Sequence, residues 1–569
     1  MKTIIHLNQI GYITNLSKTA TVITNTTSFS ICEKTSGTAL YSGKLTDPIE
    51  DIASGDITRT ADFSDFQMQG EYYLKVGSKK SYPFKIENFP YYALEQDILK
   101  AFYYNRCGIT IHKKFAGIYR RKKCHTAFAL LDSDPSISLD VTGGWHDAGD
   151  YARYTITAAT TVGHLLYAYE FFPTSFENTV NIPESGNGTP DILNECRYEL
   201  DWLLKMQAKD GGVYHKVSSK NYPNNIMPCD DEEQLFVFDK SSAAAANFAA
   251  VTALAARIYE SFDSDFSVRL RIAAGNAWIW LLNNPNRTPS SNIDRVITLE
   301  YSDRNFYDDT FWAAAELYRL TGDQSFNEKV CEIYDRVDTT ACTWNSVGGF
   351  GAVSYIFSDK PKDALVLDAL KTAFVYKSDN IVSMSHHSGY GTAKQGNRYL
   401  WGSNMEIMTF AMALIVADSI SPNDDYITAA LEQLNYILGK NPMGISYVTS
   451  FGSNFVSHPH HRPCSADEID DPIKGFIVGG PDMLRTDEHA RWLIKKGTPP
   501  AKCYVDMEYS YSTNEVAIYW NSPAIFVLGF LNKKYKAQEE PPKNDIEPTD
   551  ETSISSPDFT PQIRENPAN

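Results

Sequence analysis

Residues 241–262 read SSAAAANFAAVTALAARIYESF, a run without glycine or proline. Its many small side chains allow helices to approach closely, so the run predicts a helix packed tightly against its neighbours. Segments of similar helical periodicity lie on both sides of it. The predicted helices are residues 93–107, 154–172, 190–207, 241–262, 268–282, 309–321, 361–374, 404–419, 425–438 and 514–531.

Ten to twelve helices joined by long connections rich in glycine, proline and aromatic residues indicate concentric helical rings. In such a fold we expect the functional side chains on the loops at one end. Pro361 suits the first position of its predicted helix, where a missing N–H costs nothing.

The first 88 residues have a different pattern, with short β-rich runs about every ten residues. These runs are residues 3–7, 19–24, 29–33, 39–45, 57–63, 71–76 and 82–86. About seven short strands in such a length predict an immunoglobulin-like β-sandwich. The Cys…Trp…Cys pattern of true immunoglobulin domains is absent.

We therefore expect a β-sandwich over residues 1–88 and a helical domain over 89–535. Residues 536–569 hold many proline, acidic, serine and threonine residues, which predicts a disordered tail or linker.

Composition excludes several classes of protein. Of 569 residues, 43% are hydrophobic and 21% charged, which fits a globular protein and excludes a disordered or collagen-like chain. The net charge of −18 argues against a nucleic-acid partner. No run of eighteen apolar residues occurs, so we expect no membrane partner.

Two features of the sequence bear on its location. The opening MKTIIHLNQIGYI lacks the features of a signal peptide, which predicts a cytoplasmic protein, or a secreted one whose leader was removed. Nine scattered cysteines argue for a reducing compartment or a metal site.

The segment GGWHDAGDY, residues 143–151, holds two aspartates three positions apart. Flanking glycines let a ligand approach the backbone, and both carboxylates of Asp147 and Asp150 can point to one place. Such a pair can hold a metal, cap a helix, or orient and deprotonate a water molecule.

The segment YVDMEYSYSTNE, residues 504–515, runs into the helix predicted over 514–531. Thr513 or Asn514 suits the N-cap, and Glu515 in the first turn complements the helix dipole. Alternatively, Glu515 is a general acid whose pKa is raised by desolvation among aromatic rings.

A third segment joins SYVTSFGSN, residues 446–454, to HPHHR, residues 458–462. Histidine and arginine in a polar loop offer donors to hydroxyl groups or anions. The alternative is a metal site made of His458, His460 and His461.

Together these three segments resemble glycoside hydrolase family 9, the inverting cellulases with an (α/α)6 barrel. The resemblance spans nearly the whole chain, with the segments in the family's order. Three further stretches look like family segments: LNQIGY at 7–12, which resembles the start of an N-terminal Ig-like module, FWAAAELY at 311–318 and WGSN at 401–404.

The resemblance implies a role for each acidic residue in the motifs. Inversion needs an acid and a base on opposite faces of the sugar, roughly 6.5–9.5 Å apart. By position in the family motifs, Asp150 is the base, Asp147 helps to hold the attacking water and Glu515 is the acid. Asp506 is a supporting carboxylate.

The resemblance also implies residues that bind the sugar. His460 and Arg462 match the family's substrate-binding pair. The candidates for aromatic sugar platforms, for which core packing is the alternative, are Trp145, Trp401, Tyr509 and Tyr511.

Cys107, Cys124, His125 and His146 form a Cys2His2 set, whose spacing is not that of a zinc finger. The branch of the family with an Ig-like module carries a structural zinc with this arrangement. The resemblance therefore implies a closed site that fixes the catalytic loop. The alternative is two buried cysteines and two incidental histidines.

Two acidic stretches resemble segments that supply a calcium site in family members. They contain Asp308 and Asp309 before a predicted helix, and Asp359 further on. A solvated acidic helix start is the alternative for the first pair.

The favoured function is hydrolysis of β-1,4-glucan by an endoglucanase or cellodextrinase, without an organic cofactor and acting as a monomer. The rival activity is that of an exo-β-glucosaminidase acting on chitosan oligomers. The other rivals are a non-catalytic carbohydrate-binding barrel and a zinc-dependent hydrolase.

Overall fold

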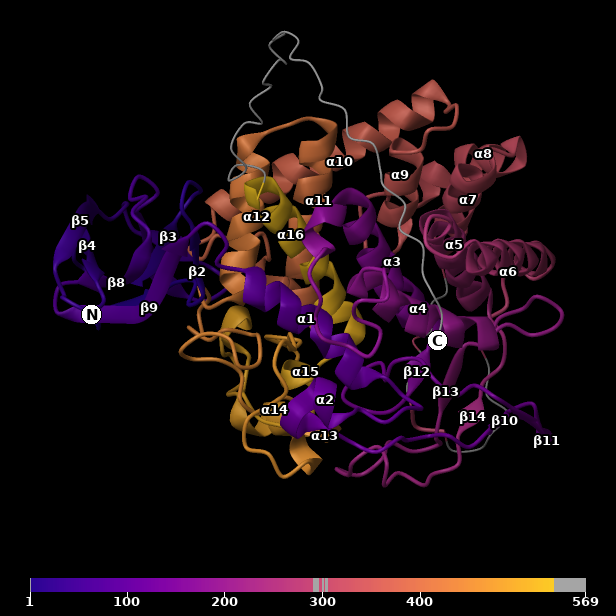
Figure 1. Ribbon diagram of the computed structural model, residues 1–569. Coiled ribbons are helices and arrows are strands. Elements are labelled where there is room, and N and C mark those ends of the chain that lie inside the picture. The colour runs from indigo at the N-terminus through magenta and orange to yellow at the C-terminus, as the bar shows by residue number, and fades with distance from the viewer. Residues whose placement is uncertain (1, 290–295, 299–300, 302–304, 537–569) are drawn as a thin grey trace, which may run out of the picture.

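The computed structural model describes residues 2–289, 296–298, 301 and 305–536. The tail predicted over 536–569 lies, apart from Lys536, outside the described residues. Two domains follow one another: a β-sandwich that ends with β9 (Lys79–Glu87), and a helical domain that begins with α1 (Tyr92–Asn105). Figure 1 shows the sandwich against one side of the helical domain.

The N-terminal domain consists of two packed sheets with strand orders β1-β3-β7-β6 and β2-β9-β8-β4-β5. Tyr12, Phe63 and Phe84 pack ring to ring at its centre, with centroids 5.1–5.5 Å apart. The remaining strands are β1 (Ile4–His6), β2 (Gly11–Ile13), β3 (Thr19–Ile23), β4 (Ser28–Glu33), β5 (Ala39–Lys44), β6 (Ile49–Asp51), β7 (Asp56–Asp62) and β8 (Gly70–Val76). All seven predicted strands are present, and the sequence analysis missed the three-residue strands β2 and β6.

Six helices of the second domain form an inner ring. They are α3 (Thr155–Phe171), α5 (Ser242–Tyr259), α7 (Tyr307–Thr321), α9 (Gly348–Ile356), α11 (Ser403–Ile420) and α16 (Ile518–Lys536). α3 contacts α5, α5 contacts α7, and α7 contacts α9. The last helix, α16, contacts both α11 and α3. Nearly every residue of α5 is buried, because its alanines leave room for neighbours on all sides.

The outer ring pairs with the inner one. It consists of α1, α4 (Asp191–Lys205), α6 (Ser264–Asn283), α8 (Gln324–Ile333), α10 (Ala364–His386) and α12 (Asp424–Ile437). Of these helices, α10 buries one face and exposes the other, since only every third or fourth residue is buried, whereas α12 is buried along nearly its whole length. The expected concentric helical rings are thus present.

Several helix boundaries differ from the sequence prediction, among them the end of α10 (Ala364–His386), which lies twelve residues beyond the predicted one. The helix expected from Pro361 begins at Ala364, because the side chain of Asp363 caps it by accepting from the N–H groups of Leu365 and Val366. The helix expected over 514–531 is split: α15 (Tyr511–Asn514) ends before Glu515, and α16 begins at Ile518. The sequence analysis also missed α8 and α9, the second of which opens with two glycines.

A five-stranded sheet within the helical domain was not predicted. Its strands are β10 (Ala129–Leu131), β11 (Asp134–Leu139), β12 (Arg153–Tyr154), β13 (Lys216–Ser218) and β14 (Phe236–Val237). Figure 1 shows these strands at the same end of the barrel as α13 (Arg462–Ala466), α14 (Glu488–Leu493) and α15. The connections at this end therefore carry the GGWHDAGDY, HPHHR and YVDMEYSYSTNE segments.

By length and composition alone, α11 is apolar enough to cross a membrane. However, 72% of its 18-residue window is buried inside the protein, where α11 contacts α10, α12 and α16. The inner ring of the barrel accounts for this apolar helix.

Candidate active site

The loop of residues 143–151 approaches its neighbours too closely for most side chains. Gly144 has a φ of +74°, and a Cβ there would lie 2.7 Å from the Trp202 ring. A Cβ at Gly149 would lie 2.3 Å from the carbonyl oxygen of His460. Gly144 therefore lets this loop pack on Trp202, and Gly149 lets it pack directly on the 458–462 segment.

Asp147 belongs to this loop, and its side chain is fully buried. Its carboxylate accepts hydrogen bonds from the hydroxyl groups of Thr157 and Tyr301, the second at 3.1 Å. Burial, together with the nearby charge of Asp150, raises the pKa of Asp147 to about 7. Asp147 is thus held in one orientation by two donors.

Asp150 lies in the same loop and is 8% exposed. Burial raises its pKa, whereas the guanidinium of Arg462 and the N–H of Ala152, 2.9 Å from Oδ1, lower it. Arg462 is itself fixed, because it donates to the carbonyl oxygens of Gly149 and Pro223 at 2.8 and 2.9 Å. A positive charge therefore stands beside the carboxylate of Asp150.

Glu515 lies in extended backbone between α15 and α16, so the expected place in a first helical turn is wrong. Residues 460 and 515 pair as a β-bridge, and the Gly149 N–H donates to the Glu515 carboxylate. Burial raises the pKa of Glu515 well above its usual value, with a further rise from the negative charge of Asp150. Tertiary pairing, and not a helix dipole, therefore places this side chain.

His460 and Tyr511 lie beside Glu515. His460 Nδ1 donates to the carbonyl oxygen of Glu508 at 2.5 Å, and burial lowers the pKa of the imidazole to about 4. The ring is therefore neutral at pH 7, and its Nε2 is an acceptor. The ring of Tyr511 lies 6.2 Å from His460 and 5.1 Å from Trp401.

Asp506 acts on the backbone of the site. Its carboxylate accepts from the N–H groups of Ser457 and His458 at 2.9 and 3.0 Å, and from Asn514 Nδ2 at 2.9 Å. It thereby joins the segments that carry His460 and Glu515.

The expectation that Trp145 is a sugar platform is wrong. Its ring is 1% exposed, packs 5.0 Å from Phe102, and donates from Nε1 to Glu195. Trp401 is partly exposed and lines a cavity of about 400 Å³ together with Trp344, Lys394 and Arg398.

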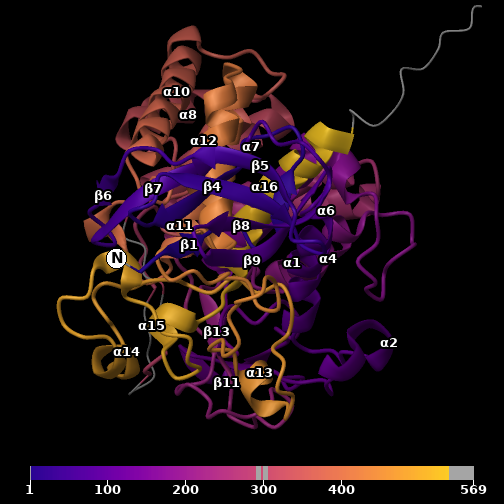
Figure 2. The ribbon, with the colours of Figure 1, turned by 90° about the vertical axis from the view of Figure 1, so that its left-hand side faces the viewer.

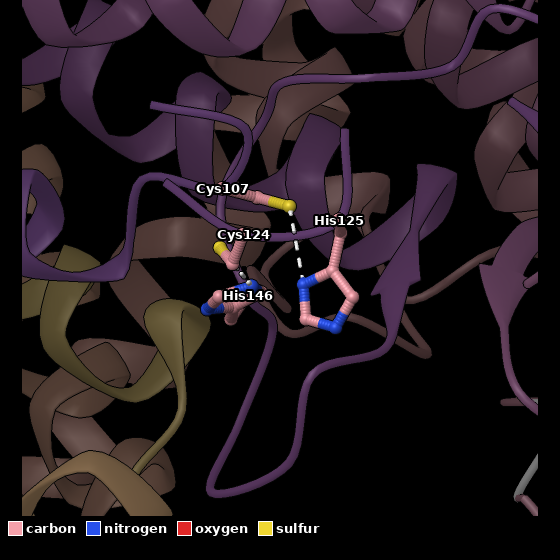
Figure 3. Close-up of side chains that lie close together, drawn as sticks. All are labelled: Cys107, Cys124, His125 and His146. Atoms are coloured by element: carbon pink, nitrogen blue, oxygen red, sulfur yellow. Dashed lines mark hydrogen bonds between the residues drawn. The ribbon is translucent and has the colours of Figure 1, made fainter. Parts of the chain in front are cut away.

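Figure 3 shows Cys107, Cys124, His125 and His146 converging. One potential ligand atom from each lies within 4.8 Å of the others, and this is the one such metal-ligand group among the described residues. Cys107 Sγ lies 3.8 Å from His125 Nδ1, and Cys124 Sγ lies 3.8 Å from His146 Nε2. Two thiols and two imidazoles at this spacing are suited to a tetrahedral ion such as zinc.

Neighbouring groups orient these four side chains. His125 Nε2 donates to Asp231 at 3.2 Å, which leaves Nδ1 facing the cluster, an arrangement common among metal-ligating histidines. The backbone of His146 is fixed, because its main-chain N–H donates to the carbonyl oxygen of Asn105 at 2.8 Å. Because Asp147 is the next residue, the cluster anchors the loop of residues 143–151, which we call the aspartate loop.

The alternative metal site of three histidines does not form. His458 is exposed beside Asp506, His460 bonds to Glu508, and His461 Nδ1 lies 3.1 Å from Cys464 Sγ in the interior. Each ring has a different partner.

The three residues expected to bind calcium are not brought together. Asp308 and Asp309 begin α7 and are buried, where they accept from the Val347 N–H and from Asn247. Asp359 lines a surface pocket with Arg319 and Leu320, at the other end of the same helix. Eleven helical residues separate the two ends by about 16 Å, so one ion cannot bind all three carboxylates.

Known proteins share this architecture. Residues 91–528 match the model of glycosyl hydrolase family 9, and residues 2–81 match the cellulase N-terminal Ig-like domain. The chain belongs to glycosyl hydrolase family 9. The family accounts for the carboxyl groups that converge at one end of the barrel.

Individual relatives cover nearly the whole of this family 9 enzyme. A cellodextrinase of Butyrivibrio fibrisolvens is 38% identical over 92% of this chain and 98% of its own. Endoglucanase D of Acetivibrio thermocellus is 36% identical over 98% of this chain and 84% of its own. A solved structure, AaCel9A in complex with cellobiose-like isofagomine, matches 93% of this chain and 99% of its own. Its TM-score is 0.88 and its sequence identity 33%.

Some residues that shape the site of this family 9 enzyme escaped the sequence analysis. Thr157, Tyr301 and Tyr519 surround Asp147, with the Tyr519 hydroxyl 3.0 Å from that of Tyr301. Tyr519 follows Glu515 by four residues, but Tyr301 lies far from every motif. A signal in the sequence was therefore present only for Tyr519.

Proposed function

We propose that this enzyme hydrolyses β-1,4-glucosidic bonds with inversion at the anomeric carbon, Asp150 being the general base and Glu515 the general acid. The observation that carries the proposal is the convergence of Asp147, Asp150 and Glu515 around Gly149 and Arg462. The names of the relatives, cellodextrinase and endoglucanase, supply the substrate class.

The electrostatics of the two carboxyl groups support their separate roles. Among the described residues Glu515 forms no ion pair, and burial raises its pKa well above its usual value, which favours the protonated form that an acid must have. Arg462 and the Ala152 N–H favour the charged form of Asp150, which a base requires. Asp147, oriented by Thr157 and Tyr301, holds the attacking water beside Asp150.

Neighbouring side chains bind and orient the sugar. His460 Nε2 accepts a hydroxyl hydrogen, because Nδ1 is committed to Glu508. Trp401 and Tyr511 offer ring faces to the apolar faces of glucosyl units.

The residues at the Cys2His2 cluster suit a structural zinc ion. Four protein ligands close the coordination shell, so the ion would fix the loop that carries Asp147 and Asp150 without contacting substrate. The chemistry of hydrolysis belongs to the carboxyl groups.

Hydrolysis of cellotetraose followed by proton NMR tests the proposal. The first product should be the α-anomer, since inversion at a β-linkage yields it. An initial β-anomer, or hydrolysis of chitosan dimers but not of cellotetraose, would overturn the proposal.

The variant Asp150→Asn tests the base. Because water must be deprotonated whatever the leaving group, activity should be lost on cellotetraose and on aryl cellobiosides alike. Azide should restore turnover of the aryl substrate and give an α-glycosyl azide. Retained activity would transfer the role of base to Asp147.

A further inference from the structure

Exposed aromatic side chains lie together on α14 and on the segment just before α15. Trp492 is 79% exposed and Tyr509 is 51% exposed. The ring of His489 lies 5.5 Å from that of Tyr509, with 30° between the planes. His489 and Trp492 are three residues apart on α14 and so share one face of the helix. We call these three residues the outer aromatic row.

The fold holds this row in place without using Trp492 for its own packing. Asp487 caps α14 by accepting from the Ala490 N–H at 2.6 Å, and accepts from Ser510 Oγ and the Ser512 N–H, both at 2.9 Å. One buried carboxylate therefore ties α14 to the Tyr509–Tyr511 segment. The inner face of the helix packs in a separate small core with Ala490 and Ile494, which leaves Trp492 to solvent.

The row continues the aromatic lining of the candidate active site. Tyr509 stands two residues before Tyr511, whose ring lies 5.1 Å from Trp401. The carbonyl oxygen of Glu508, the residue before Tyr509, accepts from His460 Nδ1. Figures 1 and 2 both show α14 next to α15, at the end of the barrel where Glu515 lies.

We infer that the outer aromatic row is an additional subsite that binds the distant part of a long β-glucan chain, beyond the glucosyl units held at the catalytic carboxyl groups. This inference rests on the proposed function. The broad faces of β-linked glucosyl units carry only C–H groups, so they pack on indole and phenol rings while their hydroxyl groups stay in water. Exposed aromatic clusters on a protein surface commonly mark such binding sites.

A chain-length series tests the subsite. The variant Trp492→Ala should keep the kcat/KM of the wild type on cellotriose and aryl cellobiosides, which are too short to reach α14. On cellohexaose and soluble barley β-glucan its kcat/KM should fall about tenfold, with the loss in KM. Trp492→Phe should recover most of this loss. The melting temperature should be unchanged, because the side chain is exposed.

Tyr376→Ala is the matched control. Tyr376 is an exposed aromatic residue on the outer helix α10, so its removal should leave every substrate unaffected. The inference would be overturned if Trp492→Ala lowered kcat/KM equally on short and long substrates. It would also be overturned if the variant lowered kcat/KM on neither. If the wild type hydrolysed no β-glucan of any length, the proposed function would fail instead, which separates the two outcomes.

Discussion

At the scale of single residues, the burial of Glu515 raises the pKa of its carboxyl group and so favours the protonated form that a general acid needs. The two other carboxylates of the 504–515 segment have different partners, since Asp506 accepts from the N–H groups of Ser457 and His458 and Glu508 accepts from the Tyr509 hydroxyl. The role of Glu515 therefore depends on the leaving group of the substrate.

Glu515→Gln should reduce kcat on cellotetraose by about 10²- to 10⁴-fold, the usual contribution of general acid catalysis. An aryl cellobioside with an activated leaving group needs no proton and should be hydrolysed nearly as well as by the wild type. Steady-state kinetics on both substrates measures the difference. Equal losses on the two would contradict the assignment.

Arg462 lowers the pKa of both Asp150 and Glu515. The base must be charged, so activity is lost as the pH falls through the pKa of Asp150. The acid must be protonated, so activity is lost as the pH rises through the pKa of Glu515. Arg462→Gln should raise both pKa values and move the whole profile of kcat/KM to higher pH.

Arg269→Gln, on the exposed side of α6, is the control for Arg462→Gln and should leave the pH profile in place. Since Arg462 also holds the Gly149 carbonyl, a fall in the maximum is expected as well. If the maximum of the kcat/KM profile fell but its acidic and basic limbs stayed at the same pH, the role of Arg462 would be limited to positioning the loop through the Gly149 carbonyl.

At the scale of structural elements, the aspartate loop has little regular structure of its own between β11 and β12. Its order depends on the Cys2His2 cluster at one end and on contact with the 458–462 segment at the other. For such a loop, the binding energy of a metal is also folding energy.

Purified protein should therefore contain about one zinc by elemental analysis. Strong chelators and the variant Cys124→Ser should remove the metal, lower the melting temperature by several degrees and reduce kcat together. Cys32→Ser, a change at a buried cysteine of the N-terminal sandwich, is the control that should keep the metal. A folded, fully active protein without zinc would contradict this prediction.

At the scale of the whole molecule, the β-sandwich reaches into the catalytic domain through the LNQIGY segment. Gln9 Oε1 accepts from the N–H groups of Ser453 and Asn454 at 3.0 and 2.8 Å, and its Nε2 donates to the Gly444 carbonyl at 3.0 Å. The chain continues from Asn454 to His460 within six residues. One side chain of the first domain thus holds the start of the segment that carries His460.

Gln9→Ala should leave two partly buried N–H groups without an acceptor, at a cost of about 1–3 kcal/mol. We expect a lower melting temperature and a raised KM on cellotetraose, with a smaller change in kcat. Gln69→Ala, at an exposed position of the same domain, should change neither. An unchanged KM in Gln9→Ala would show that the two domains are merely adjacent.

Much of the architecture could be predicted from local pattern. The alanine-rich run at 241–262 and the periodic segments around it predicted ten of the twelve helices in the two rings, because burial of apolar residues imposes a period that survives in the sequence. Seven of the nine strands of the N-terminal sandwich were predicted from their β-rich runs and the turns between them. The resemblance to family 9 also named all four residues of the metal-ligand cluster.

The tertiary structure alone decided what the sequence pattern left open. Whether Trp145 is a platform or core depends on Phe102 and Glu195, and whether three aspartates share an ion depends on the length of α7. Local pattern placed Glu515 on a helix, whereas pairing with His460 holds it in extended backbone. The physical reason is common to all three: period and propensity act over neighbouring residues, but desolvation, charge and hydrogen bonding at a site act between segments some fifty residues apart in the sequence.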